Sequence, residues 1–118
     1  MERRKFNRVI FSAPAMLMQG DKQWQTAVID VSLQGALIDY PDEFEAELEL
    51  DFQLDIEIEG ANRHILMHGY IVHNANHRLG FKVKDIDVES ITELRRIVEL
   101  NLGDETLLKR NFKALSDN

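Results

Sequence analysis

The sequence feature that most constrains the fold is a strict alternation of apolar and polar residues at positions 47–59. Side chains of a β-strand point alternately to opposite faces, so the pattern predicts a strand with one face in a core and the other in water. Acidic residues and glutamine occupy the polar positions. The apolar set consists of Leu48, Leu50, Phe52, Leu54, Ile56 and Ile58.

Several further segments are rich in β-branched or bulky apolar residues and are separated by turn-forming residues such as glycine, asparagine, aspartate and proline. Short strands at regular spacing are typical of a closed barrel or a sandwich. The expected core includes Leu37, Leu48, Leu50, Phe52, Leu54, Ile71 and Phe81, with Trp24 also in a structural role. The additional predicted strands are 9–18, 24–30, 36–39, 63–73 and 78–84.

The periodicity changes after the last predicted strand. Apolar residues recur at helical spacing from position 88 to 102, with Asp87 as the expected N-cap and Gly103 as the stop signal. A second, shorter helix is expected at about 104–112. The sequence thus predicts a mostly β protein: a barrel or sandwich at 9–86, preceded by a basic arm at 1–8 and followed by a helical tail at 87–118.

Length and composition limit the classes of function. A chain of 118 residues fits one domain, and the absence of cysteine excludes disulfides, cysteine-based zinc sites and thiol catalysis. With no apolar run long enough for a membrane span and no signal-peptide core, a cytoplasmic protein without membrane insertion is expected. The net charge of -7 argues against a nucleic-acid partner, although Arg3, Arg4, Lys5 and Arg8 make the first eight residues basic.

Three short motifs occur in strand context. The first is R-x-x-x-R from Arg4 to Arg8, the second is D-x-S-x-x-G from Asp30 to Gly35, and the third comprises the stretches 69–73 and 78–81. Each is weak alone, but their order and spacing resemble the signature of PilZ domains over residues 3–84. The resemblance implies a six-stranded antiparallel PilZ-like β-barrel that acts as a receptor for the bacterial second messenger cyclic di-GMP, with an arm that closes over the nucleotide.

The ligand's chemistry suits the residue types in these motifs. A guanidinium on Arg4 or Arg8 can donate in a forked way to guanine O6 and N7 or to a phosphate. The carboxylate of Asp30 can accept the N–H groups of a guanine edge. Ser32 can donate a hydrogen bond to a phosphate or a base, and Gly35 is expected to permit a positive-φ turn and a close approach of backbone to ligand.

Two further positions are assigned from the resemblance. In such domains a basic residue at the position of Arg3 can help to hold a second, intercalated nucleotide, so one or two ligands for each chain are both compatible with the sequence. His73 stands where many relatives have tryptophan. An imidazole can stack on guanine, but with less area than an indole.

Other functions are also compatible with the sequence. The same fold could serve as a nucleotide-independent adaptor in pilus or motility machinery, or as a small barrel that binds single-stranded RNA. The basic arm could be a solvated tail, and His64, His68, His73 and His77 are better explained as surface residues than as metal ligands. No motif of an enzyme is found, so neither catalysis nor a cofactor is expected. A downstream protein partner is expected, and the choice between monomer and homodimer is left undecided.

Overall fold

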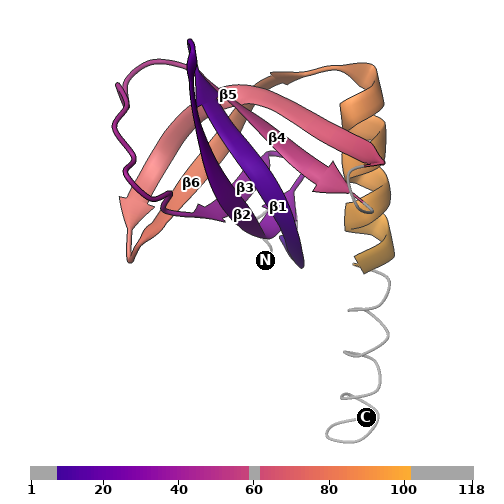
Figure 1. Ribbon diagram of the computed structural model, residues 1–118. Helices are drawn as coiled ribbons and strands as arrows, with labels where there is room; N and C mark the ends of the chain where they lie inside the picture. The colour runs from indigo at the N-terminus through magenta and orange to yellow at the C-terminus, as the bar shows by residue number, and fades with distance from the viewer. Residues whose placement is uncertain (1–7, 59–61, 102–118) are drawn as a thin grey trace, which may run out of the picture.

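The computed structural model describes residues 8–58 and 62–101, which form six antiparallel strands and one helix (Figure 1). The strands close into a barrel in the order β1-β2-β3-β6-β5-β4. The predicted six-stranded antiparallel barrel with a C-terminal helix is therefore confirmed. The strands are β1 Val9–Gln19, β2 Lys22–Ser32, β3 Gly35–Asp39, β4 Phe52–Ile58, β5 Arg63–Ala75 and β6 Arg78–Ile86, and the helix is described over 88–101.

The barrel core is built by alternate residues of each strand. In β4 every second residue from Phe52 to Ile58 is buried, as the alternation of apolar and polar residues predicted. Leu17 of β1 and Ile38 of β3 are also fully buried. Trp24 is half-buried and packs edge-on against the Phe44 ring, with ring centroids 4.8 Å apart, so its expected structural role is confirmed.

The predicted strand at 47–59 is too long at its beginning. β4 starts at Phe52, and before it Leu48 and Leu50 are 39% and 50% exposed, so they are not core residues. The last pair between β4 and β1 joins Gln53 to Met18, next to the end of β1, so residues before Phe52 have no β1 residue to pair with. The backbone forms a turn instead, in which the Leu50 amide donates to the Glu47 carbonyl.

Leu37 is a second correction to the predicted core. Its neighbours Ala36 and Ile38 point into the barrel and are buried, so alternation places the Leu37 side chain on the outer face, where it is half-buried. Ile71 is partly buried and packs against the core, and Phe81 is buried, as expected.

The helix covers one end of the barrel. Leu94, Ile97 and Val98 are buried in the same core cluster as the strand residues, and Figure 1 shows the helix beside the end of β4 and the start of β5. Asp87 is the N-cap, as predicted, because its Oδ1 accepts a 2.7 Å hydrogen bond from the Ser90 amide. Within the described residues, no helix has the length and apolar character needed to cross a membrane. The expected Gly103 stop and second helix lie outside these residues.

A buried serine joins the helix to the barrel. β6 ends at Ile86, which pairs with Met67 of β5. The next β5 residue towards the N-terminus, Leu66, donates its amide to Ser90 Oγ at 2.9 Å instead of to β6. The helix therefore continues the hydrogen bonding of β5 where the neighbouring strand stops.

Replacing Ser90 should weaken this junction. Ser90→Ala removes the acceptor for the Leu66 amide and should lower the free energy of unfolding by about 1–2 kcal/mol. Thr92→Ala is the matched control, because the Thr92 hydroxyl donates only within the helix, to the Val88 carbonyl, and its loss should cost at most about 0.5 kcal/mol. Urea unfolding followed by Trp24 fluorescence measures both variants. Equal losses would show that the Ser90 contact is not what holds the helix.

Candidate functional site

The last residue of the first motif and the first residue of the second motif are in direct contact. The Arg8 guanidinium binds Asp30 Oδ1 through Nε at 2.9 Å and through Nη2 at 2.7 Å. Strand pairing explains the contact, because Ile10 of β1 lies opposite Asp30 of β2 and Arg8 stands two residues before Ile10. The side chains are 45% and 19% exposed, so the pair lies on the outer surface and is accessible from solvent.

A β-bulge turns Asp30 to the outer face. Val28 and Val31 are both buried at 1% exposure, although regular alternation would put residues three positions apart on opposite faces. The register between β2 and β3 shifts between Val28 and Asp30, which inserts Ile29 as an extra residue. Asp30 then pairs with the outward-facing Leu37, so the bulge keeps the carboxylate out of the core.

A second bulge does the same for His73. The register between β5 and β6 shifts between Ile71 and His73, and Val72 is the inserted residue. Ile71 pairs with the buried Phe81, whereas His73 pairs with Gly80 and is exposed. A Cβ added to Gly80 would lie 2.8 Å from the Cβ of His73, so the imidazole rises directly beside a position that has no side chain.

The strand register aligns these residues in one row across the barrel. From β5 to β1 the row runs through His73, Gly80, Leu37, Asp30 and Ile10, each opposite the next. His73 and Asp30 are three strand spacings apart, or about 14 Å along the curved sheet. The row combines an exposed imidazole, a glycine gap, an apolar floor and the carboxylate paired with Arg8.

Ser32 and Gly35 shape the hairpin between β2 and β3. Ser32 is buried, and its Oγ accepts a 3.1 Å hydrogen bond from the Gln34 amide, which stabilises the turn. The expected positive φ at Gly35 is wrong, since among the described glycines only Gly20 has one. Gly35 is needed for a different reason: a Cβ there would overlap the carbonyl oxygen of Phe81 on the neighbouring strand β6.

Two basic residues of this face were missed by the sequence analysis. Arg78 and Lys82 stand two positions on either side of Gly80 in a strand of regular register with β3, so they share its outer face. Lys82 is exposed, and Arg78 lies 3.8 Å from Asp39. Their period-two spacing in 78–82 was the available signal. The expected ligand residues Arg3 and Arg4 lie outside the described residues.

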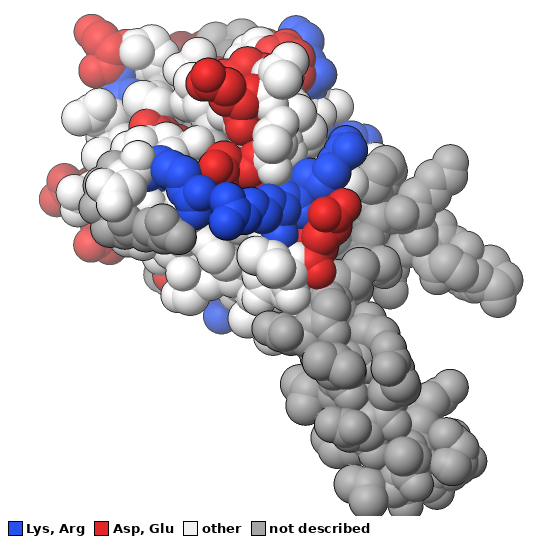
Figure 2. All heavy atoms as spheres, turned by 90° about the vertical axis from the view of Figure 1, so that its right-hand side faces the viewer, with Lys and Arg blue, Asp and Glu red and all other residues white. Residues whose placement is uncertain are grey.

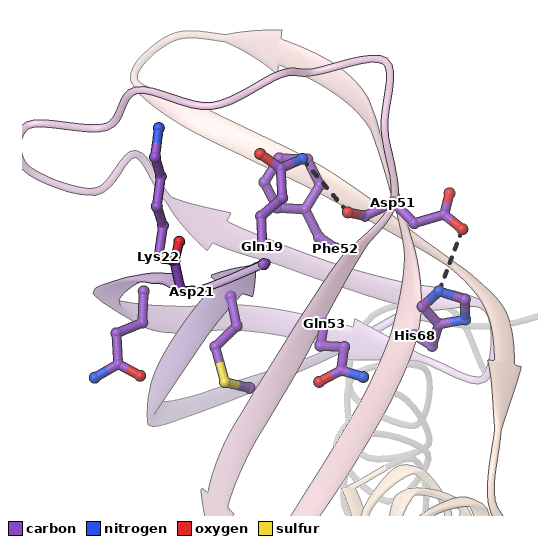
Figure 3. A pocket seen from close by; sticks show the side chains of 10 residues that line it. Gln19, Asp21, Lys22, Asp51, Phe52, Gln53 and His68 are labelled. Atoms are coloured by element: carbon purple, nitrogen blue, oxygen red, sulfur yellow. Dashed lines mark hydrogen bonds and ion pairs between the residues drawn. The ribbon is translucent and has the colours of Figure 1, made fainter.

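The polar hollow at the tip of the β1–β2 hairpin is separate from this row. Figure 3 shows Gln19, Phe52 and Gln53 around it, with the Asp51 carboxylate facing His68. The imidazole binds Asp51 at 3.2 Å and Asp85 at 3.0 Å, so it ties the start of β4 to β6. Across residues 8–58 and 62–101, no group of three His, Asp or Glu side chains is arranged to hold a metal ion.

Comparison with known proteins identifies a family that matches the sequence and solved structures that share the fold. The sequence matches the PilZ domain family over residues 2–100. The E. coli PilZ domain of YcgR, solved with cyclic di-GMP, superposes with a TM-score of 0.60 at 15% identity and covers 99% of each chain. The PilZ domain of CeSA from a cellulose-synthesising bacterium gives a TM-score of 0.59 at 18% identity, covering 84% of this chain and 98% of that one.

A third structure is similar over a part of its length. The inhibitor of motility MotI/DgrA of Bacillus subtilis gives a TM-score of 0.72 at 14% identity and covers 88% of this chain. The chain spans about half of that protein, at 53% coverage. These likenesses show the fold, and the match over most of the sequence shows the family. The chain belongs to the PilZ domain family, a family of ligand-binding and adaptor domains that typically bind cyclic di-GMP.

Proposed function

We propose that this protein is a non-enzymatic cytoplasmic receptor for cyclic di-GMP, and that the nucleotide binds on the outer face of the barrel between Arg8 and His73. The observation that supports this most strongly is the Arg8–Asp30 contact, because it brings two separate sequence motifs together on one accessible face. The E. coli PilZ domain with the same fold was solved with cyclic di-GMP.

Binding of cyclic di-GMP would replace the contact between Arg8 and Asp30 by contacts of each residue with the ligand. In the free protein Arg8 and Asp30 satisfy each other, whereas the ligand offers acceptors on phosphate and guanine to Arg8 and N–H donors to Asp30. An exposed ion pair of this kind contributes at most about 1 kcal/mol, so its disruption is a small obstacle to binding. The pair thus holds both side chains near their binding positions before the nucleotide arrives.

The remaining residues of the row would accommodate the bases. Gly80 leaves space above the sheet, Leu37 provides an apolar floor, and His73 offers a ring beside the gap for stacking. Lys82 and Arg78 flank the same gap and can approach the phosphates. Ser32 and Gly35 hold the hairpin on which the site depends.

The basic arm would complete the site. Arg4 would supply the second guanidinium of the R-x-x-x-R motif, and Arg3 would contact a second nucleotide if two bind to each chain. Closure of residues 1–8 over the ligand would cover part of the barrel face and create a surface for a downstream protein.

A nucleotide-independent adaptor is the alternative function. The feature that favours it is His73, which stands where many relatives have tryptophan.

Isothermal titration with cyclic di-GMP tests the proposal, with GTP and cyclic di-AMP as controls. Saturable heat with cyclic di-GMP alone is expected, and the stoichiometry decides whether a second nucleotide is bound. The same ligand should raise the melting temperature, because it binds the folded state. Neither heat nor a shift in melting temperature would reject the receptor and leave the adaptor.

Substitutions in the ion pair should separate the roles of its two members. Arg8→Ala should weaken binding about 5- to 150-fold, because it removes a forked donor and leaves Asp30 facing an anionic ligand. Asp30→Ala should have a smaller effect, since loss of its hydrogen bonds is partly offset by release of Arg8. Arg95→Ala, an exposed arginine of the helix, is the control. Unchanged affinity in both site variants would exclude this face.

A larger aromatic side chain at position 73 should raise the affinity for cyclic di-GMP. His73→Trp enlarges the stacking surface beside Gly80 and should tighten binding about three- to tenfold, whereas His73→Ala should weaken it. His64→Trp serves as the control, because His64 lies near the other end of β5, against Asp55. Affinities measured by titration that do not respond to the size of residue 73 would remove His73 from the site.

Gly35 should influence binding only through the fold. Gly35→Ala places a methyl group against the Phe81 carbonyl and should lower the free energy of unfolding by about 3 kcal/mol or more. Gly20→Ala is the comparison: it has open space around it and only a positive φ of 62°, for a loss of about 1–2 kcal/mol. Thermal unfolding distinguishes them. A stable Gly35→Ala protein that fails to bind would instead assign Gly35 a direct ligand contact.

A further inference from the structure

A groove lies between the helix and the barrel, away from the nucleotide face. In the part of the chain that the structure describes, β1 and β4 pair only from Ala15–Ile56 to Met18–Gln53, so the earlier part of β1 is not paired with the described end of β4. A cavity of about 450 Å³ opens there, beside the helix. Its lining includes Phe11 and Pro14 of β1, Ile58 of β4, and Ile97 and Leu100 of the helix.

The groove combines apolar surface with cationic groups. Leu100 is 61% exposed on its wall, and Arg63 and Arg96 stand among the lining residues. Figure 2 shows Lys and Arg side chains as a continuous band across the face that carries the helix. Basic side chains thus gather on this face although the whole chain has 21 acidic and only 14 basic residues. Arg63 binds Glu93 at 3.3 Å, whereas Arg96 is exposed on the helix.

We propose that this groove is the docking site for an acidic, amphipathic segment of a partner protein. A large apolar side chain of the partner would enter the cavity against Phe11 and Leu100, and a carboxylate beside it would bind Arg96. Glu57 and Glu93 also line the groove and would repel a polyanion, so nucleic acid and anionic bilayers fit it less well than a segment with one or two carboxylates.

The groove is structurally connected to the face that carries Arg8 and Asp30. The assignment of that face as the nucleotide site rests on the proposed function. The register between β1 and β2 shifts between Ile10 and Ala13, so Phe11 and Ser12 lie opposite the single residue Ile29. Ile29 immediately precedes Asp30, and both Phe11 and Ser12 line the groove. A change at the Arg8–Asp30 pair would therefore act on the groove wall through one irregular segment of two strands.

A random peptide library displayed on phage and panned against the full chain tests the docking site without nucleotide. Enriched peptides should carry Asp or Glu close to Leu or Phe. In fluorescence anisotropy with the best peptide, Arg96→Glu should weaken binding about tenfold or more, and Leu100→Ser should also weaken it. Arg95→Glu is the matched control on the same helix but outside the lining, and should leave affinity unchanged.

The decisive step is a charge exchange. The peptide with its acidic residue changed to lysine should regain affinity for the Arg96→Glu protein and lose it for the unaltered protein. No enriched peptide, equal effects of Arg95→Glu and Arg96→Glu, or no recovery after the exchange would overturn the proposal. So would Arg96-dependent binding to phosphatidylglycerol vesicles or duplex DNA in place of peptide.

The connection between the two sites has a separate readout. Saturating cyclic di-GMP should change the affinity for the peptide about fivefold or more. If the nucleotide binds and the peptide affinity stays the same, the coupling is wrong and the docking site stands. If the nucleotide does not bind, the proposed function fails, and the charge exchange alone decides the fate of the docking site.

Discussion

Strand pairing around the closed barrel determines which side chains face the core and which face solvent, and the candidate site depends on two local exceptions to that rule. In regular alternation Asp30 would be on the same side as the buried Val28, and His73 on the same side as the partly buried Ile71. One inserted residue in β2 and one in β5 reverse the orientation that follows. The bulges thus avoid burying a carboxylate and an imidazole, and they place both on one surface.

The contact between Arg8 and Asp30 then links that surface to the start of the chain. It is exposed enough to be weak and close enough to hold both groups in position, two properties that suit an exchange of partners better than a buried pair would. Arg8 stands directly before Val9, the first residue of β1, so the contact lies at the start of that strand. The helix stabilises the barrel rather than the site. Its apolar residues are buried against one end of the barrel, and Ser90 Oγ accepts a hydrogen bond from the Leu66 amide.

The sequence predicted the strands, the helix and its Asp87 cap because these follow from local periodicity and capping chemistry, whereas the choice of a closed barrel over a sandwich came from the resemblance to PilZ domains. It overestimated β4 because Leu48 and Leu50 continue the alternation where no β1 residue is left to pair with the chain. It chose Asp30 and Gly35 from motifs, but the reason for Gly35 is the approach of β6, a contact distant in sequence. The bulges that turn Asp30 and His73 outward depend on the register between strands and leave little local signal.

The single-sided pairing of the first part of β1 has a consequence for how the domain loses order. From Ala15 to Met18 the strand is held by both β2 and β4, whereas among residues 8–58 and 62–101 the stretch from Val9 to Pro14 has a ladder only with β2. Opening of that end breaks one set of hydrogen bonds and leaves the other barrel ladders intact, so it requires less free energy than global unfolding. We therefore expect the entry strand to open locally at a lower free energy than the rest of the barrel, at the cost of exposing Val9 and Ala13.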